Sequence, residues 1–223
     1  MYGPVRDDIQ FDWERPARTG VAEAVYCEGK TAPQIEALLT AGLEAGRALL
    51  LTRLSRDLLD GLSAPLAGRV DYDPLSRTGI SEGDLPNVTV SARIGIVAAG
   101  SSDLAVAREA SRTLQYHGVS PPLIADVGVA GLWRLTARLA EIRECDVLIA
   151  AAGMEGALFS VLGGLVSAPV IAVPTSIGYG VAADGRAALS SALASCAPGV
   201  VTVNIDNGFG AACAALKMAR ACR

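Results

Sequence analysis

The feature that most constrains the fold is a stretch of 28 residues, Gly156 to Ala183, that contains no charged side chain. One helix of this length would be long enough to cross a bilayer. Six glycines and prolines divide the stretch, however, and such residues break long helices. They are Gly163, Gly164, Pro169, Pro174, Gly178 and Gly180. We therefore predict a short helix, a turn, a buried strand and a glycine-rich loop inside a soluble α/β domain.

From about residue 91 to residue 223, strand-like and helix-like segments alternate with short connections. The predicted strands are 93–98, 122–126, 146–151, 169–173 and 200–204, and the predicted helices are 103–118, 131–144, 156–166, 184–195 and 208–221. This alternation predicts an α/β three-layer sandwich with a parallel sheet and right-handed crossovers. The apolar content of 51%, mostly small aliphatic residues, agrees with strands that are covered on both faces.

Residues 1–90 differ from the rest and are predicted to form a small N-terminal α/β domain and a linker. Apolar residues at helical spacing predict a helix from Thr31 to Ala45, and Ala48 to Thr52 is a candidate strand. The segment from Arg69 to Asn87 is polar and rich in Gly, Pro, Asp and Ser, so we interpret it as the linker.

Composition excludes several classes of protein. The net charge is −4 and the aromatic content is 4%, so the chain offers nucleic acids neither a basic face nor a stacking platform. No export signal is recognisable at the start, which predicts a cytoplasmic protein with reduced cysteines. A single histidine, His117, argues against a Ser–His triad or a histidine-rich metal site. The mean hydropathy of +0.38 is high for a soluble monomer and favours a homo-oligomer.

In a parallel sheet, ligands bind at the loops that leave the carboxyl ends of the strands. Loops 99–103 and 174–180 combine glycines with hydroxyl groups, which suits a phosphate or a ribose, although a helix cap or a plain turn would use the same residues. The polar cluster at 204–207 could bind a ligand or serve as an elaborate N-cap. The candidate substrate-binding residues are Gly100, Ser101, Ser102, Asp103, Gly153, Met154, Thr175, Ser176, Gly178, Tyr179, Gly180, Asn204, Asp206 and Asn207.

The loop after the third predicted strand carries Glu155, framed by Gly153, Met154 and Gly156. This carboxylate could complement the dipole of the next helix, a contribution of less than about 1 kcal/mol. Alternatively, apolar surroundings would raise its pKa and make it a proton carrier. The uncharged stretch beside Glu155 favours the second interpretation.

The five cysteines show no paired metal-ligand spacing, and residue type alone predicts inert core thiols. They are Cys27, Cys145, Cys196, Cys213 and Cys222. Cys196 follows the helix that begins near Asp184, and we group it with the loops of the fifth strand.

Seven motifs occur in a fixed order along the chain. They are Cys27–Thr31, Gly100–Asp103, Asp126–Leu132, Gly153–Leu158, Pro174–Gly180, Ser195–Ala197 and Val203–Gly210. Together they resemble the AIR carboxylase-like family that includes the PurE enzymes of purine synthesis. The closer resemblance is to the LarB family, the pyridinium-3,5-biscarboxylic acid mononucleotide synthases of nickel-pincer cofactor biosynthesis. Trp133 is a departure, because we expect histidine there in relatives.

The resemblance implies a reaction on nicotinic acid adenine dinucleotide, with CO2 or bicarbonate as co-substrate. The pyridinium ring gains a second carboxylate, and hydrolysis of the phosphoanhydride releases AMP. By motif, the family's catalytic cysteine falls on Cys196 and its glutamate on Glu155. A thiolate that adds to ring carbon 4 would make carbon 5 nucleophilic toward CO2, and Glu155 would then accept the proton from carbon 5.

The resemblance also implies a homo-oligomer, an octamer built from the PurE-like domain. Hydrolysis of a phosphoanhydride commonly uses Mg²⁺, for which the sequence offers only Asp103 and Asp206 as candidate ligands. Two alternatives remain open: a PurE-type enzyme that moves a carboxylate on aminoimidazole ribonucleotide, and a non-catalytic nucleotide-binding module on the same fold.

Overall fold

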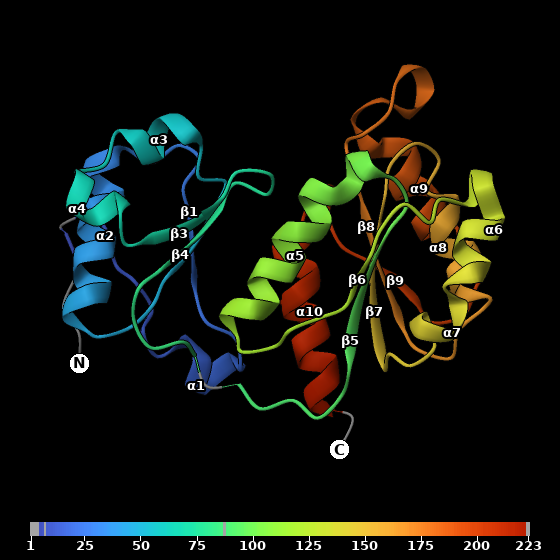
Figure 1. Cartoon of the computed structure of the whole chain (residues 1–223), viewed down its shortest axis with the longest axis horizontal. Helices are drawn as coiled ribbons and strands as arrows, with labels where there is room; N and C mark the ends of the chain where they lie inside the picture. The colour runs from blue at the N-terminus through green and yellow to red at the C-terminus, as the bar shows by residue number, and fades with distance from the viewer. Residues whose placement is uncertain (1–4, 7, 87, 222–223) are drawn as a thin grey trace. The chain divides into compact units, whose positions relative to one another are not determined.

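The computed structural model describes residues 5–6, 8–86 and 88–221. The chain divides into two compact units (Figure 1). The first comprises residues 1–88 and 116–118, and the second comprises residues 89–115 and 119–223. None of the helices in the described ranges meets both the length and the hydropathy requirements of a membrane span.

The second unit is built on a five-stranded parallel sheet. Its strands are β5 (Ile94–Ala98), β6 (Leu123–Ile124), β7 (Val147–Ala152), β8 (Val170–Pro174) and β9 (Val200–Thr202). They follow the order β6-β5-β7-β8-β9, and every neighbouring pair is parallel. In β7 all six side chains are buried, as expected for a strand covered on both faces.

Helices cover both faces of this sheet, which confirms the predicted α/β three-layer fold (Figure 1). One face carries α5 (Leu104–Tyr116) and α10 (Gly208–Ala221). The other carries α6 (Leu132–Ala137), α7 (Leu139–Ile142), α8 (Ala157–Gly163) and α9 (Arg186–Leu193). The predicted helix 131–144 is divided at Arg138, whose φ of −105° and ψ of 2° are not helical.

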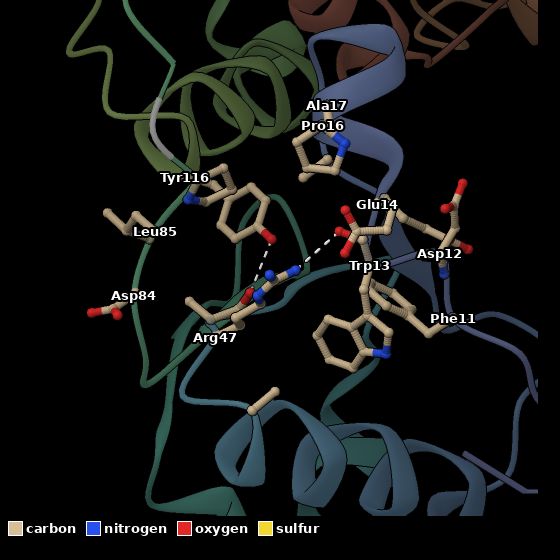
Figure 2. A pocket seen from close by; sticks show the side chains of 15 residues that line it. Phe11, Asp12, Trp13, Glu14, Pro16, Ala17, Arg47, Asp84, Leu85 and Tyr116 are labelled. Atoms are coloured by element: carbon tan, nitrogen blue, oxygen red, sulfur yellow. Dashed lines mark hydrogen bonds between the residues drawn. The ribbon is translucent and has the colours of Figure 1, made fainter. Parts of the chain in front are cut away.

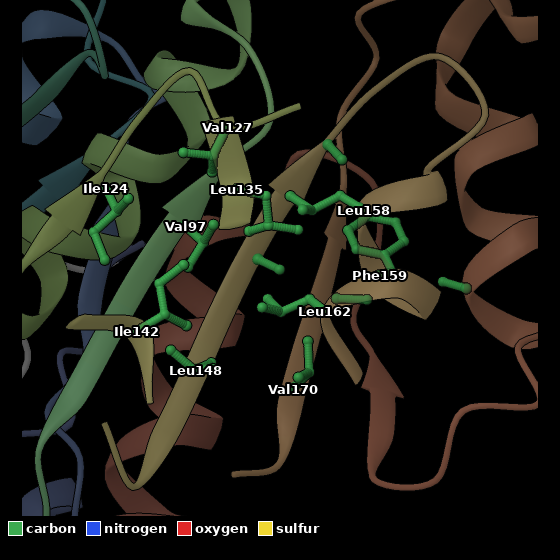
Figure 3. Close-up of a cluster of buried hydrophobic side chains, with 14 of the residues drawn as sticks. Val97, Ile124, Val127, Leu135, Ile142, Leu148, Leu158, Phe159, Leu162 and Val170 are labelled. Carbon is green, nitrogen blue, oxygen red and sulfur yellow. The ribbon is translucent and has the colours of Figure 1, made fainter. Parts of the chain in front are cut away.

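One hydrophobic core of the second unit lies between the sheet and the α6–α9 layer (Figure 3). Phe159 and Leu162 of α8 are fully buried there, together with Leu148 and Val170 of the sheet. The uncharged stretch noted in the sequence therefore supplies much of this core, through α8 and β8.

The first unit contains a mixed four-stranded sheet. Its strands are β1 (Ala24–Tyr26), β2 (Leu50–Thr52), β3 (Val70–Asp73) and β4 (Thr78–Ser81), in the order β1-β2-β4-β3. Helix α2 (Ala32–Glu44) connects β1 to β2, which are parallel. Three short helices complete the unit: α1 (Arg15–Thr19), α3 (Arg56–Asp60) and α4 (Ala64–Ala67).

The predicted linker from Arg69 to Asn87 is wrong for most of its length, because β3 and β4 form an antiparallel hairpin there. The polar residues that suggested a linker instead build the hairpin turn. The backbone N–H and the hydroxyl of Ser76 both donate to Asp73 Oδ2, and the Ser76 and Thr78 hydroxyls are hydrogen-bonded at 2.8 Å. Composition suggested a loop because these side chains are polar, yet all three are buried and paired.

Replacing Phe159 with alanine tests the importance of this core. The substitution leaves a cavity at a side chain that is 0% exposed, so we expect the free energy of unfolding of the second unit to fall by about 3–5 kcal/mol. Val181 is 97% exposed, and Val181→Ala should change this free energy by less than about 0.5 kcal/mol. Chemical denaturation followed by circular dichroism measures both, and equal effects would contradict the assigned core.

Candidate active site

The strand order of the second unit has a topological switch point between β5 and β7. Strands β6 and β7 lie on opposite sides of β5. The connection after β5 therefore leads toward β6, and the connection after β7 leads the other way, toward β8. Such a switch point is where open α/β sheets bind ligands, outside the carboxyl ends of the two strands. The loops there contain the motifs Gly100–Asp103 and Gly153–Glu155. We refer to loops 99–103, 125–131, 153–156, 175–185 and 203–207 as the carboxyl rim.

Asp103 ties two loops of the carboxyl rim together across β7. Its Oδ1 accepts a hydrogen bond from Thr175 Oγ1 at 2.6 Å, and its Oδ2 accepts one from the Gly100 N–H at 2.8 Å. Asp103 is 4% exposed and Thr175 is 0% exposed. Their polar atoms hold the loops in place, and their role in substrate binding stays a prediction.

Backbone contacts connect the other loops of the rim. The Met154 N–H donates to the Ile177 carbonyl at 2.8 Å. Asp206 bridges the loops after β8 and β9, because its N–H donates to the Pro174 carbonyl and its Oδ1 accepts from the Ser176 N–H, both at 2.8 Å. The carboxyl rim is thus one connected structure rather than a set of independent loops.

Four non-glycine residues of the rim have left-handed backbone conformations. Their φ values are 57° for Asp126, 52° for Met154, 58° for Asp184 and 54° for Asp206. Each lies in a different loop, after β6, β7, β8 and β9 respectively. Such conformations cost free energy and concentrate at functional sites. Sequence reasoning missed Asp126 and Asp184, although an Asp directly after a strand is a weak signal for this conformation.

Gly153 is required by the packing of two loops. A Cβ atom at this position would lie 2.2 Å from the Ile177 carbonyl oxygen and 2.7 Å from Thr175 Oγ1. Only glycine therefore fits, so Gly153 shapes the rim, and its role in substrate binding stays a prediction. Gly178 is similar, because its Cβ would lie 2.4 Å from the Ala182 carbonyl oxygen.

The remaining predicted binding residues divide into exposed groups and helix caps. Ser101, Ser102, Ser176, Tyr179, Gly180 and Asn204 are exposed at the rim, together with Met154. Asn207 caps α10, because its Oδ1 accepts from the Gly210 N–H at 2.8 Å, so the capping interpretation holds there. The rim thus presents hydroxyl, amide and apolar groups, which suit a nucleotide.

Glu155 lies at the rim, directly before α8, but its surroundings differ from those predicted. The side chain is exposed, because the left-handed Met154 and Gly156 (φ 64°) turn the loop outward above the core. The uncharged stretch packs below the loop and does not enclose the carboxylate. The carboxylate is therefore exposed to solvent in the single chain.

Cys196 does not join the rim, so our grouping of this residue with the carboxyl-end loops is wrong. It lies in the connection from α9 to β9, which enters the sheet at the amino ends of the strands. The Val170 N–H, at the start of β8, donates to the Gly199 carbonyl at 3.0 Å. A Cβ on Gly163, the last residue of α8, would lie 3.1 Å from the Ala197 Cβ.

Glu155 and Cys196 therefore lie at opposite ends of α8. The seven residues of this helix rise by about 10 Å along the helix axis. The Cys196 side chain is exposed, in contrast to the inert core thiol that residue type alone predicts. The hydroxyl of the preceding residue, Ser195, is hydrogen-bonded at 2.8 Å to that of Ser160 in the middle of α8.

The other cysteines lie in different environments. Cys27 and Cys145 are buried, and desolvation raises the pKa of Cys27 to about 12 and raises the pKa of Cys145. These two agree with the prediction of inert core thiols. Cys213 is partly buried, and Cys222 lies outside the described residues.

The carboxylates named as magnesium ligands do not form a metal site within the chain. In the part of the chain that the structure describes, no group of three His, Cys, Asp or Glu side chains could hold a metal ion. Both carboxylate oxygens of Asp103 already accept hydrogen bonds from the protein. Asp206 Oδ1 accepts from the Ser176 N–H. Because Mg²⁺ is commonly held by one or two carboxylates together with waters and substrate phosphates, the proposal that Asp103 and Asp206 bind it stays a prediction.

A cavity of about 350 Å³ lies in the first unit (Figure 2). Arg47 crosses it and donates from Nη1 to the Trp13 carbonyl at 3.0 Å, while the Tyr116 hydroxyl donates to the Ala48 carbonyl at 3.0 Å. None of the predicted site residues lines this cavity. We therefore locate the candidate active site at the carboxyl rim, where the strained loops and the predicted motifs coincide.

The Asp103–Thr175 hydrogen bond can be tested by replacing Thr175 with valine. The change keeps the side-chain shape but leaves a buried carboxylate oxygen without its donor, so the free energy of unfolding should fall by about 1–3 kcal/mol. Thr175→Ser retains the hydroxyl and should lose clearly less. Urea denaturation compares the two variants, and a valine variant as stable as the serine variant would contradict the assigned role.

Thiol labelling tests the assigned exposure of the cysteines. Because Cys196 is exposed and Cys27 is buried with a raised pKa, a maleimide at neutral pH should modify Cys196 first in the folded protein. Denaturation should remove the difference. Mass spectrometry of the labelled peptides measures the order, and rapid modification of Cys27 in the folded chain would contradict it.

Comparison with known proteins agrees with this architecture. Residues 93–222 match the AIR carboxylase family, and residues 7–83 match the LarB/PurE-like N-terminal domain. An uncharacterized protein of Methanocaldococcus jannaschii is 38% identical over 218 residues, which cover 94% of this chain and 83% of that protein. The N5-carboxyaminoimidazole ribonucleotide mutase of the same organism is 37% identical over 130 residues, which cover 56% of this chain and 77% of the mutase. The chain therefore belongs to the AIR carboxylase family, with a LarB/PurE-like N-terminal domain ahead of the family domain.

Proposed function

We propose that the protein carboxylates the pyridinium ring of nicotinic acid adenine dinucleotide and hydrolyses its phosphoanhydride. The products are pyridinium-3,5-biscarboxylic acid mononucleotide and AMP. The observation that carries this proposal is the occurrence, in one chain, of a LarB/PurE-like N-terminal domain and an AIR carboxylase domain. The exposed thiol of Cys196 and the exposed carboxylate of Glu155 add support.

The chemistry explains why such a site needs a thiol. A pyridinium ring is electron-poor, so its carbon 5 does not attack CO2. Addition of the Cys196 thiolate to carbon 4 forms a C–S bond and converts the ring into a dihydropyridine. The enamine electrons of this intermediate then form a bond from carbon 5 to the carbon of CO2.

A base completes the reaction. Glu155 accepts the proton from carbon 5 in our proposal, which restores the enamine. The C–S bond then breaks, the thiolate leaves with its electron pair, and the ring becomes aromatic again. The net change is replacement of one ring proton by a carboxylate, with no oxidant or reductant consumed. The exposed Ser101, Ser102 and Ser176 at the rim suit the phosphate and ribose groups of the substrate.

A second candidate function is carboxylate transfer on an aminoimidazole ribonucleotide. It is favoured by the 37% identity to a protein named N5-carboxyaminoimidazole ribonucleotide mutase. Both candidates place a nucleotide at the same rim and form a carbon–carbon bond on its heterocycle. They differ in the need for a nucleophilic thiol, so Cys196 decides between them.

The experiment incubates the protein with nicotinic acid adenine dinucleotide and ¹³C-bicarbonate and follows products by mass spectrometry. We expect a labelled biscarboxylated mononucleotide together with AMP. Cys196→Ser should abolish this product, whereas Cys213→Ser, the matched control, should retain it. Glu155→Gln should lower the rate by about 10²-fold or more. Turnover of an aminoimidazole ribonucleotide instead of the dinucleotide would select the second candidate.

A further inference from the structure

The thiol of Cys196 is exposed, but the residues on either side of it are held by α8. The hydroxyls of Ser195 and Ser160 are hydrogen-bonded at 2.8 Å, and Ser160 lies in the middle of that helix. Ser195 Oγ also accepts a hydrogen bond from the Ala197 N–H at 3.2 Å. The Ser195 hydroxyl thus connects the residue after the cysteine to the residue before it, and both of them to the helix.

A second contact with α8 lies at Gly163, close to one turn further along the helix. A Cβ atom on this glycine would lie 2.8 Å from Val200 Cγ2 and 3.1 Å from the Ala197 Cβ, so the connection packs directly against the helix backbone. Ser160 and Gly163 are three residues apart and therefore share one face of α8. This face anchors the connection from α9 to β9 on both sides of Cys196.

We propose that Ser160 and Gly163 are positioning residues, which fix the backbone at Cys196 and so direct its thiol toward the ring of the substrate. This inference rests on the proposed function, in which the sulfur forms a bond to ring carbon 4. Both residues act through the connection that carries the thiol, and not through a contact of their own with the substrate.

A fixed backbone matters because the thiol takes part in two steps of each cycle. The sulfur must reach carbon 4 to form the C–S bond, and it must later leave with its electron pair. A group that is already held near the required geometry loses less freedom on reaching it, and a misplacement of about 1 Å can cost about 100-fold in rate. The contacts of Ser195 and Ala197 restrict the backbone while the side chain of Cys196 stays accessible.

Ser160→Ala tests the hydroxyl contact. The variant should fold, because Ser195 keeps its hydrogen bond with the Ala197 N–H. Amide hydrogen exchange in residues 195–199, followed by mass spectrometry, should become about five- to tenfold faster, the effect of one lost hydrogen bond. With the dinucleotide as substrate, kcat should fall by about tenfold, whereas KM should change by less than about twofold because the carboxyl rim still holds the substrate. Ser160→Thr retains a hydroxyl and should restore both exchange and kcat.

Ser190 provides the matched control, because it is an exposed serine of α9. Ser190→Ala should change neither exchange in residues 195–199 nor kcat nor KM. Both alanine variants should keep the circular dichroism spectrum of the wild type. Equal exchange rates in Ser160→Ala and Ser190→Ala would overturn the inference, and so would a loss of kcat that is fully accounted for by unfolded protein.

The two glycines at the end of α8 give an independent comparison. Gly163→Ala forces the connection to move, because Ala197 and Val200 occupy the space of the new methyl group. The methyl group of Gly164→Ala would meet only carbonyl oxygens of its own helix, the nearest at 3.5 Å, which is an ordinary contact. We expect Gly163→Ala to lower kcat by about tenfold or more with KM retained, and Gly164→Ala to leave both unchanged. Equal kcat values for the two variants would overturn the inference.

The proposed function and the positioning role fail separately. If wild-type protein does not convert the dinucleotide, the proposed function is wrong, and the exchange measurement still decides whether α8 holds the connection. If wild-type protein is active and Ser160→Ala matches it in exchange and in kcat, the function stands and the positioning role is wrong.

Discussion

All strands of the sheet in the second unit run in the same direction, and this parallel arrangement determines the placement of every reactive group. Each loop that leaves a strand lies at the carboxyl end of the sheet, and each loop that enters a strand lies at the amino end. Parallel strands require crossover helices, which bury the sheet on both faces. A reactive residue in a loop of this sheet therefore lies either at the carboxyl end or at the amino end of the strands. Glu155 follows β7 at the carboxyl end of the sheet, and Cys196 precedes β9 at the amino end.

The rim at the carboxyl edge is held by polar contacts that the chain makes with itself. Asp103 and Asp206 both use carboxylate oxygens to connect loops, so two residues predicted to bind a ligand or a metal also stabilise the scaffold. Their contacts, together with the packing of the core beneath, offset the cost of four left-handed non-glycine residues. The exposed hydroxyls next to them are then positioned by a fixed backbone.

The sequence predicted the second unit better than the first for a physical reason. In the second unit, burial on both faces produces long apolar runs such as β7 and β8, which stand out without any knowledge of contacts. In the first unit, the β3–β4 hairpin buries Asp73, Ser76 and Thr78, whose polarity suggested a linker. Only the tertiary hydrogen bonds of these residues reveal that they belong to a strand and a turn. The predicted division of the chain at about residue 90 relied on the change in composition alone.

The candidate site was predictable in its loops but not in the roles of its residues. Motif order identified Gly153, Met154 and Glu155 as one unit, and the switch point explains why this loop matters. No pattern in the sequence indicates that Glu155 is exposed, because this depends on the direction of the backbone at left-handed residues. The place of Cys196 was predictable, because the predicted helix 184–195 precedes the predicted strand 200–204 and a residue between them enters a parallel sheet at its amino end.

The close approach at Gly153 has a consequence for how such motifs are interpreted in other chains. Its hydrogen atoms face a neighbouring carbonyl oxygen, so selection can retain this glycine to preserve architecture whatever molecule the protein handles. The glutamate two positions later makes no such structural contribution in the isolated chain. A homologue that keeps the glycine and replaces the acid would share the scaffold while catalysing different chemistry. In such a motif the glutamate indicates the chemistry, whereas the glycine indicates the shared fold.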